Sequence, residues 1–139
     1  MPSIINDNPY LPVPAKVEST YFESDDRTLK TLTFSFLDTS LREKFNFLPG
    51  QFIELSILGK GESPFGIASN PNEELIKITV NRTGYVTKAI HNLSKGDIVG
   101  IRGPLGNWFP ISKFVGSNLA IISGGFAFTT LASLTDYLL

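Results

Sequence analysis

Residues 76–93, IKITVNRTGYVTKAIHNL, combine a strand, a glycine turn and a helix start in a spacing that could bind phosphate. Apolar and polar residues alternate over 76–80, which predicts a half-buried strand. Apolar residues over 86–93 recur at i, i+3, i+4 and i+7, which predicts a short helix. A helix start presents unpaired N–H groups with partial positive charge, and the turn glycine, Gly84, lets a ligand approach the backbone closely. The pattern is typical of a phosphate seat, which the hydroxyl of Thr87 could join, and also of an ordinary strand-to-helix connection.

The composition sets limits on the chemistry that this chain can perform. The 139 residues are enough for one domain, or for one domain and a fragment, and a hydrophobic content of 42% supports a buried core. A net charge of −1 without a basic stripe gives no argument for nucleic acid. The absence of cysteine excludes disulfides, zinc thiolate sites and iron–sulfur clusters held by this chain. No pattern of metal ligands is present, so we expect no metal site.

The N-terminal residues give no sign of a membrane protein. They lack a basic region followed by an apolar core, and no apolar run in the chain approaches the length of a membrane span. We therefore expect a cytoplasmic protein without a membrane partner. Four prolines within residues 1–14 predict an extended lead-in.

Short strands separated by turn residues dominate the next hundred residues. Alternating or apolar runs predict six strands at 16–23, 31–36, 51–57, 65–68, 76–80 and 98–102. Only one short helix, after the fifth strand, interrupts this series. The pattern predicts a mainly β domain over residues 15–112, a six-stranded antiparallel Greek-key barrel that is closed or nearly closed.

The last part of the chain has a different character. The apolar run LAIIS at 119–123 predicts a strand that is buried on both faces, as in a parallel sheet. Gly124 and Gly125 follow, and an apolar stripe over 129–139 predicts a helix. The pattern thus predicts that residues 113–139 form the first βα unit of a Rossmann-like domain. Because one such unit cannot cover its own apolar faces, we expect a truncated product, or else packing of this piece on the barrel or on another chain.

Several short motifs together resemble a known family. The chain is similar to the ferredoxin reductase-like flavoproteins, which have an FAD-binding barrel followed by an NAD(P)-binding domain. The gamma subunits of cytoplasmic hydrogenases (sulfhydrogenases) and the electron-transfer subunit of dihydroorotate dehydrogenase look nearest. The resemblance covers nearly the whole chain and rests on the order of PGQF at 49–52, SPFGIAS at 63–69, GYVT at 84–87, GD at 96–97, GPLG at 103–106 and GG at 124–125.

This resemblance implies a flavin site with changes at three positions. The family normally has Arg-x-Tyr-Ser where this chain has residues 63–66. In the family, the arginine pairs with the diphosphate, the tyrosine packs on the isoalloxazine ring and the serine bonds near N5. Here Ser63, Phe65 and Gly66 stand in those places. The ring of Phe65 can still stack, but a serine cannot replace the bidentate arginine.

Further departures lie in the phosphate seat and in the nucleotide motif. Asn81 stands where the family often has arginine or lysine, so the helix start would carry most of the phosphate binding and we expect weakened FAD affinity. In the motif Gly-Gly-x-Gly-x-x-Pro, Ala127 and Thr130 replace the third glycine and the proline. NAD(P) binding is therefore expected only in a complete protein. The resemblance implies cofactor contacts from Ser63, Pro64, Phe65, Gly66, Thr79, Val80, Asn81, Gly84, Val86 and Thr87 for FAD, and from Gly124 and Gly125 for NAD(P).

The function implied is that of an FAD-binding electron-transfer subunit of an NAD(P)H-linked oxidoreductase. Its partner would be an iron–sulfur or hydrogenase-type redox subunit, and no side chain need act as a general acid or base. His91, the only histidine, is expected to face solvent. Two alternatives stay open: a flavin-free barrel that serves as a docking module in a redox complex, and a barrel that binds another small ligand.

Overall fold

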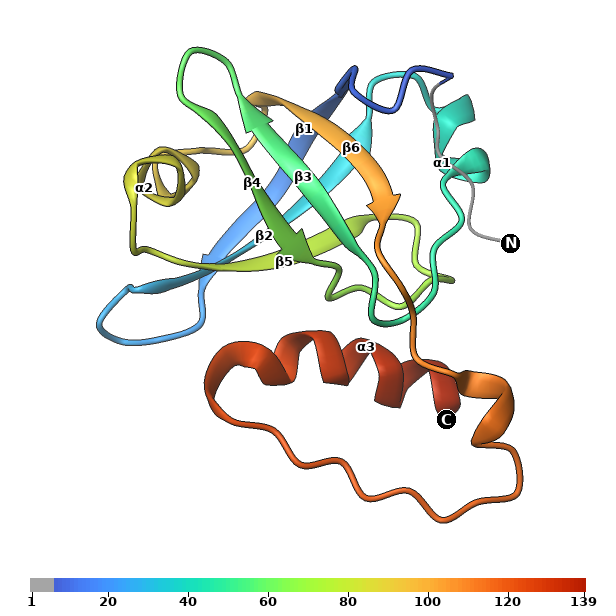
Figure 1. The fold of residues 1–139 in the computed structure, drawn as a ribbon. Coiled ribbons are helices and arrows are strands. Elements are labelled where there is room, and N and C mark those ends of the chain that lie inside the picture. The colour runs from blue at the N-terminus through green and yellow to red at the C-terminus, as the bar shows by residue number, and fades with distance from the viewer. Residues whose placement is uncertain (1–6) are drawn as a thin grey trace.

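The computed structural model describes residues 7–139, so residues 1–6 of the predicted lead-in lie outside the described residues. Figure 1 shows a twisted β-sheet with α2 (Tyr85–His91) on one side, α1 (Ser40–Lys44) on the other and α3 (Phe128–Leu138) beneath it. The elements are β1 (Val13–Phe22), β2 (Leu29–Phe36), α1 (Ser40–Lys44), β3 (Phe52–Ile57), β4 (Gly61–Gly66), β5 (Ile76–Asn81), α2 (Tyr85–His91), β6 (Ile98–Leu105) and α3 (Phe128–Leu138), with 3-10 turns at Ile111–Lys113 and Gly125–Ala127.

The six strands form a single antiparallel sheet in the order β4-β3-β6-β1-β2-β5. The last strand, β6, inserts between β1 and β3, which confirms the predicted Greek-key barrel fold. The sheet is not closed, because β4 and β5 remain its two edges. Just beyond β4, the amide of Ala68 donates to the carbonyl of Lys77 at 2.8 Å, so the two edges approach each other at one end.

The core follows the alternation in β2, the clearest strand of the sequence. Leu32, Phe34 and Phe36 point into the barrel and are buried. The threonines between them point to the opposite face of the strand, as the alternation predicts, but they do not face water. Thr31 and Thr33 are also buried, and each hydroxyl is hydrogen bonded to a residue of a neighbouring strand. The outer face of β2 is therefore polar but covered.

The limits of the strands differ from the prediction mainly at β4. A three-residue turn at 58–60 lets Gly61 pair with Ile57, so β4 begins well before the predicted start at residue 65. Pro64 interrupts no ladder between central strands because β4 is an edge strand, where proline is tolerated. β1 also begins earlier than predicted, and Pro14 of the expected lead-in is part of it.

The prediction that His91 faces solvent is wrong. His91 is 8% exposed, and its Nε2–H donates to the carbonyl of Val80 at 2.9 Å. The ring of Phe22 covers the imidazole, with 6.1 Å between ring centroids. The buried ammonium of Lys30 donates to the carbonyls of His91 and Leu93 at 2.9 and 2.7 Å. His91 thus links the end of α2 to β5 by a hydrogen bond. Its position next to the apolar stripe of the helix did not predict this contact.

Protonation of His91 should destabilise the fold. Burial, with the nearby charges of Lys30 and Arg82, lowers the pKa of His91 below its ordinary 6.5, although the bond to Val80 opposes this shift. The folded state therefore binds a proton less tightly than the unfolded state, so the stabilisation is complete above about pH 6.5 and is lost as pH falls through the lower folded pKa. Urea unfolding between pH 7.5 and pH 5 should show this loss.

The matched variant is His91→Gln, whose side-chain amide can still donate to Val80. The carboxylates with lowered pKa values, Asp26 and Glu62 among them, affect stability at more acidic pH. They are present in both the original chain and the variant. The variant should lack the destabilisation between pH 6.5 and pH 5. Equal slopes of unfolding free energy against pH in the two proteins would contradict the assignment.

The C-terminal segment only partly matches its prediction. Residues 119–123 lie in no strand, and Ile122 is 92% exposed, because residues 7–139 provide no neighbouring strand for this run to pair with. The predicted helix is present as α3, beneath the barrel (Figure 1). Ser133 Oγ donates to the carbonyl of Ser69 at 2.6 Å, and Leu134 is buried. Within residues 7–139, no helix has the length and apolar character needed to cross a membrane.

Candidate functional site

A cavity of about 310 Å³ lies where the two edge strands, the start of α2 and the start of α3 meet. Six of the residues predicted to contact a cofactor line it: Pro64, Phe65, Gly66, Thr79, Asn81 and Thr87. The other lining residues are Thr83, Phe126, Ala127, Thr129 and Thr130. The structure therefore brings residues from β4, β5 and α2 together as the resemblance implied, and adds a wall from α3.

The other predicted residues do not line this cavity. Val80 is fully buried in the core, and Val86 packs against the same core. Ser63 is half-buried in β4, and Gly84 is exposed immediately before α2. The remaining two, at 124–125, are exposed glycines at the far end of the turn that leads to α3.

No pattern in the sequence places Phe126 and the neighbouring threonines at the candidate site. Their place follows from the packing of α3 against the barrel, a long-range contact that no local pattern encodes. The one signal for these residues was that Ala127 and Thr130 belong to the glycine-rich motif. The resemblance assigned that motif to NAD(P) and not to FAD.

The start of α2 is organised by the hydroxyl of Thr87. This oxygen accepts the N–H groups of Thr83 at 3.0 Å and Gly84 at 2.7 Å, and donates to the carbonyl of Gly84 at 3.1 Å. The first helical bond runs from Lys88 N to Gly84 O at 3.0 Å. The N–H groups of residues 85–87 precede this bond, so they have no partner within the helix. The backbone, rather than the Thr87 hydroxyl, supplies the donors for an anion here.

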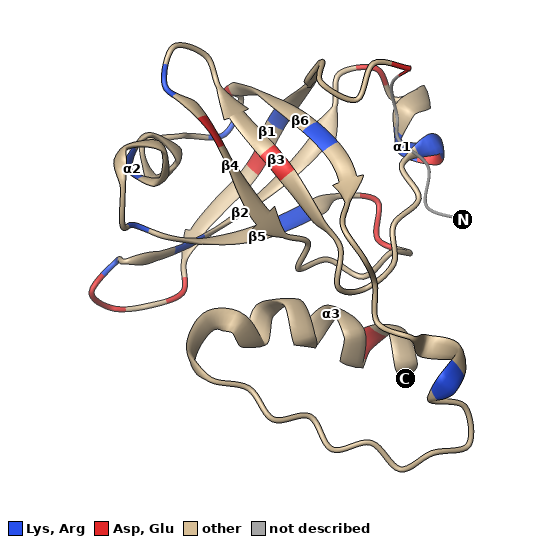
Figure 2. Cartoon of the chain, in the orientation of Figure 1, with Lys and Arg blue, Asp and Glu red and all other residues tan. Residues whose placement is uncertain are grey.

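The lining of the cavity is neutral and rich in hydroxyls. It contains five threonines and two phenylalanines, and none of its residues is charged. Figure 2 shows the charged residues distributed over the barrel, whereas residues 114–139 carry only Asp136. A ligand would be held here by aromatic faces, hydroxyls and backbone N–H groups. A diphosphate would find no cationic side chain in the lining.

Gly66 and Thr130 are matched to each other in this structure. A Cβ atom added to Gly66 would lie 2.6 Å from Thr130 Oγ1, closer than van der Waals contact allows. The resemblance implies a serine in place of Gly66 and a proline in place of Thr130. Both departures meet at one contact between β4 and α3, so glycine is what allows α3 to approach the barrel.

Gly66→Ser should therefore lower the free energy of unfolding, by about 1–2 kcal/mol, because the added side chain overpacks the contact with Thr130. Urea unfolding measures the change. The same substitution in a Thr130→Ala background should cost less than half as much, since the clashing hydroxyl is gone. Gly84→Ser is the control, because a Cβ there meets nothing within 4 Å. Equal costs in both backgrounds would disprove the coupling.

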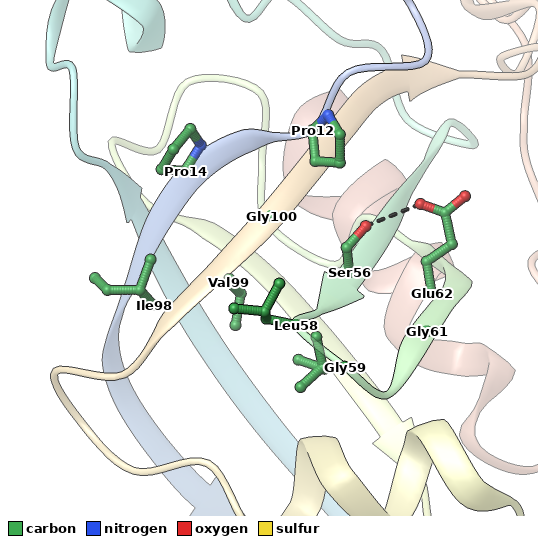
Figure 3. A pocket seen from close by; sticks show the side chains of 11 residues that line it. Pro12, Pro14, Ser56, Leu58, Gly59, Gly61, Glu62, Ile98, Val99 and Gly100 are labelled. Carbon is green, nitrogen blue, oxygen red and sulfur yellow. Dashed lines mark hydrogen bonds between the residues drawn. The ribbon is translucent and has the colours of Figure 1, made fainter.

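A larger cavity lies elsewhere and has different chemistry. It measures about 560 Å³ and lies over β1, β3, β4 and β6 (Figure 3). Its lining is mostly apolar and includes Pro12, Leu58 and Ile98, while the hydroxyl of Ser56 donates to Glu62 at 2.8 Å. It contains none of the predicted site residues. Volume alone does not identify a binding site, and the smaller cavity has the convergent polar groups.

Comparison with known proteins agrees with the resemblance. The chain is 41% identical over 132 residues to sulfhydrogenase 2 subunit gamma of Pyrococcus furiosus, covering 94% of this chain and 44% of the relative. It is 40% identical over 81 residues to the probable dihydroorotate dehydrogenase B (NAD(+)) electron transfer subunit of Methanocaldococcus jannaschii, covering 58% of this chain and 28% of that one. The chain thus spans less than half the length of these relatives.

Solved structures show the same fold at low sequence identity. The cytochrome P450 reductase GcoB of Amycolatopsis matches 91% of this chain and 38% of its own length, with a TM-score of 0.76 and 22% identity. A ferredoxin-NADP+ reductase of Plasmodium falciparum matches 98% and 56%, with a TM-score of 0.78 and 18% identity. The model of the oxidoreductase FAD-binding domain matches residues 22–109, which is more than half of the chain. The chain therefore belongs to the oxidoreductase FAD-binding domain family.

Proposed function

We propose that this chain is the FAD-binding part of an electron-transfer subunit, with the flavin ring in the cavity between β4, β5 and α3. One observation carries the proposal: Phe65 of β4 and Thr87, in the first turn of α2, line the same cavity. A flavin dinucleotide needs an aromatic ring beside its own ring system, and it needs N–H groups without a helical partner for its diphosphate.

Each residue has a definite task in this proposal. The ring of Phe65 packs against the isoalloxazine, and the N–H groups at 85–87 bind the diphosphate. Gly84 leaves room for the phosphates beside the backbone, since no atom lies within 4 Å of the position of a Cβ there. Bound FAD would supply the redox chemistry, taking an electron pair as hydride and releasing single electrons. The side chains position the cofactor and transfer no proton.

The partners belong to the same proposal. The relatives are named as subunits of a sulfhydrogenase and of a dihydroorotate dehydrogenase, and one name includes NAD(+). By analogy, the complete protein would exchange electrons between NAD(P)H and an iron–sulfur or hydrogenase-type subunit. Residues 15–112 would form the FAD-binding unit, and 113–139 would begin the NAD(P)-binding unit at Gly124 and Gly125. The proposal retains the cytoplasmic location expected from the sequence.

Titration of the purified 139-residue chain with FAD tests the proposal. Binding should change the flavin fluorescence and raise the melting temperature in proportion to the logarithm of FAD concentration. Riboflavin, which lacks the diphosphate, serves as the control and should bind more weakly. An unchanged melting temperature at saturating FAD, together with unchanged flavin fluorescence, would refute flavin binding by this chain.

The second candidate is a flavin-free docking module. The neutral lining of the cavity favours it, because Ser63 and Asn81 stand where the family has cationic residues. The same titration separates the two functions, since a docking module would not respond to FAD.

Asn81→Arg should strengthen FAD binding if the first proposal holds. Asn81 lines the cavity, so a guanidinium at this position can pair with the diphosphate. We expect about a tenfold gain in affinity, which should diminish between 50 mM and 500 mM salt because the added contact is ionic. Asn81→Gln is the control for side-chain length. A salt-independent affinity equal to that of the original chain would show that the diphosphate lies elsewhere.

A further inference from the structure

A hydrogen bond from His91 joins two walls of the candidate site. Its Nε2–H donates to the carbonyl of Val80 at 2.9 Å. Val80 lies between Thr79 and Asn81 of β5, and both of these neighbours line the cavity. His91 follows Thr87 by four residues, so it lies one turn further along the same face of α2, and Thr87 lines the cavity as well. The bond therefore fixes the α2 wall of the cavity against the β5 wall.

The other ring nitrogen of His91 is buried without a partner. A carbonyl can only accept, so Nε2 has the proton of the neutral ring and Nδ1 has a lone pair. Nδ1 makes no hydrogen bond within the described residues, and the ring of Phe22 covers the imidazole. A second proton would therefore create a buried, charged N–H group without an acceptor, which is costly. Protonation should favour a ring turned toward water, with the bond to Val80 broken.

The charged groups around the imidazole also oppose its protonation. From β2, the ammonium of Lys30 donates to the backbone carbonyl of His91 at 2.9 Å, and Arg82 directly follows β5. Both cations lower the pKa of His91, and the part of the chain that the structure describes brings no carboxylate to bear on it. Arg27, whose guanidinium lies 4.4 Å from the centre of the covering ring, lowers the pKa of Lys30, and Asp97 raises it. An imidazolium here would meet two cations and no counter-charge.

We propose that His91 is a positioning residue for the candidate site and makes ligand binding there dependent on protonation. While the ring is neutral, its bond to Val80 holds the two walls together and the site binds its ligand. When the ring is protonated, the bond is lost, α2 is released from β5 and the ligand dissociates more readily. The inference rests on the proposed flavin function and adds a means of regulating that same site by acidification.

The test measures the affinity of the full chain for FAD from pH 7.5 to pH 5. The lining of the cavity has no titratable side chain, and FAD keeps its charge over this range. Because the pKa of folded His91 lies below 6.5, affinity should be constant above about pH 6.5 and fall about threefold to tenfold by pH 5. Near-ultraviolet circular dichroism checks that the chain stays folded. Binding at pH 5 should also release protons, which calorimetry in two buffers of different ionisation enthalpy measures.

Variants separate the hydrogen bond from the titration. His91→Gln keeps a donor for Val80 but takes up no proton, so it should bind FAD within about threefold of the original chain at pH 7.5 and keep that affinity at pH 5. His91→Leu has no donor and should bind about tenfold more weakly at every pH. Asn92→His, added to His91→Gln, places an imidazole at the exposed neighbouring position and should not restore the pH dependence.

The outcomes distinguish this inference from the function on which it rests. An equal fall in affinity with pH in the original chain and in His91→Gln would overturn the role of His91 while leaving flavin binding intact. An affinity of the original chain that is the same at pH 7.5 and pH 5 would do so too. Absence of any FAD binding by the original chain at pH 7.5 would overturn the proposed function and this inference together.

Discussion

Gly84→Val should abolish FAD binding while leaving the fold intact. The glycine stands immediately before α2 in an extended conformation, φ −134°, that any residue can adopt. A Cβ there meets no protein atom within 4 Å, so valine fits the unoccupied protein. In the proposed complex, that space belongs to the diphosphate. We expect affinity to fall by more than about 100-fold, or roughly 3 kcal/mol, in the fluorescence titration.

Two variants control for indirect effects. Gly84→Ala adds a single methyl group and should cause a smaller loss of affinity. Asn92→Val places the same branched side chain at the exposed opposite end of α2, and should leave FAD binding unchanged. Unfolding free energies of all three should lie within about 1 kcal/mol of the original. If Gly84→Val binds FAD normally, the phosphate seat has been assigned to the wrong part of the chain.

Lys30→Met should cause the largest loss of stability among the substitutions considered. Lys30 is buried, with 5% of the residue exposed, and its ammonium donates to the carbonyls of His91 and Leu93. Methionine has a similar length but no donor, so two carbonyls at the end of α2 lose a charged partner. We expect the free energy of unfolding in urea to fall by about 2–4 kcal/mol.

Lys16→Met is the matched control for this substitution. Lys16 forms an ion pair with Glu18 at 3.0 Å, but its side chain is 42% exposed, so the loss should be below about 1 kcal/mol. Because Lys30 anchors the helix whose start is the proposed phosphate seat, Lys30→Met should also weaken FAD binding. A cost similar to that of Lys16→Met would mean that water readily replaces the buried ammonium.

The barrel could be predicted because its information is local. In β2, apolar residues point inward and threonines outward, and such alternation specifies both the strand and its buried face. Turn residues mark the ends of most strands, and the order of the short motifs indicates the family, which the match over 22–109 confirms. Half of the predicted cofactor contacts line one cavity because they belong to β4, β5 and α2, whose pairing follows from that fold.

The features that could not be predicted depend on contacts between distant parts of the chain. His91 is buried only because Phe22 and Lys30, far away in sequence, close over the end of α2. The apolar run at 119–123 has the composition of a central strand but no neighbouring strand among residues 7–139, and strand formation requires a partner. Phe126 lines the cavity through the docking of α3, which the helical pattern alone did not place.

The cavity lies between the two edge strands of the barrel, so a ligand there could hold these edges together. β4 and β5 share no ladder of backbone bonds, and the cavity is lined by Phe65 from one edge and Thr79 from the other. A molecule in the cavity would bridge this seam and complete the cylinder in place of the missing strand contacts. Ligand binding and the rigidity of the barrel are therefore thermodynamically linked. A change that weakens the contact between β4 and β5 should weaken binding, and a bound ligand should make the barrel more rigid.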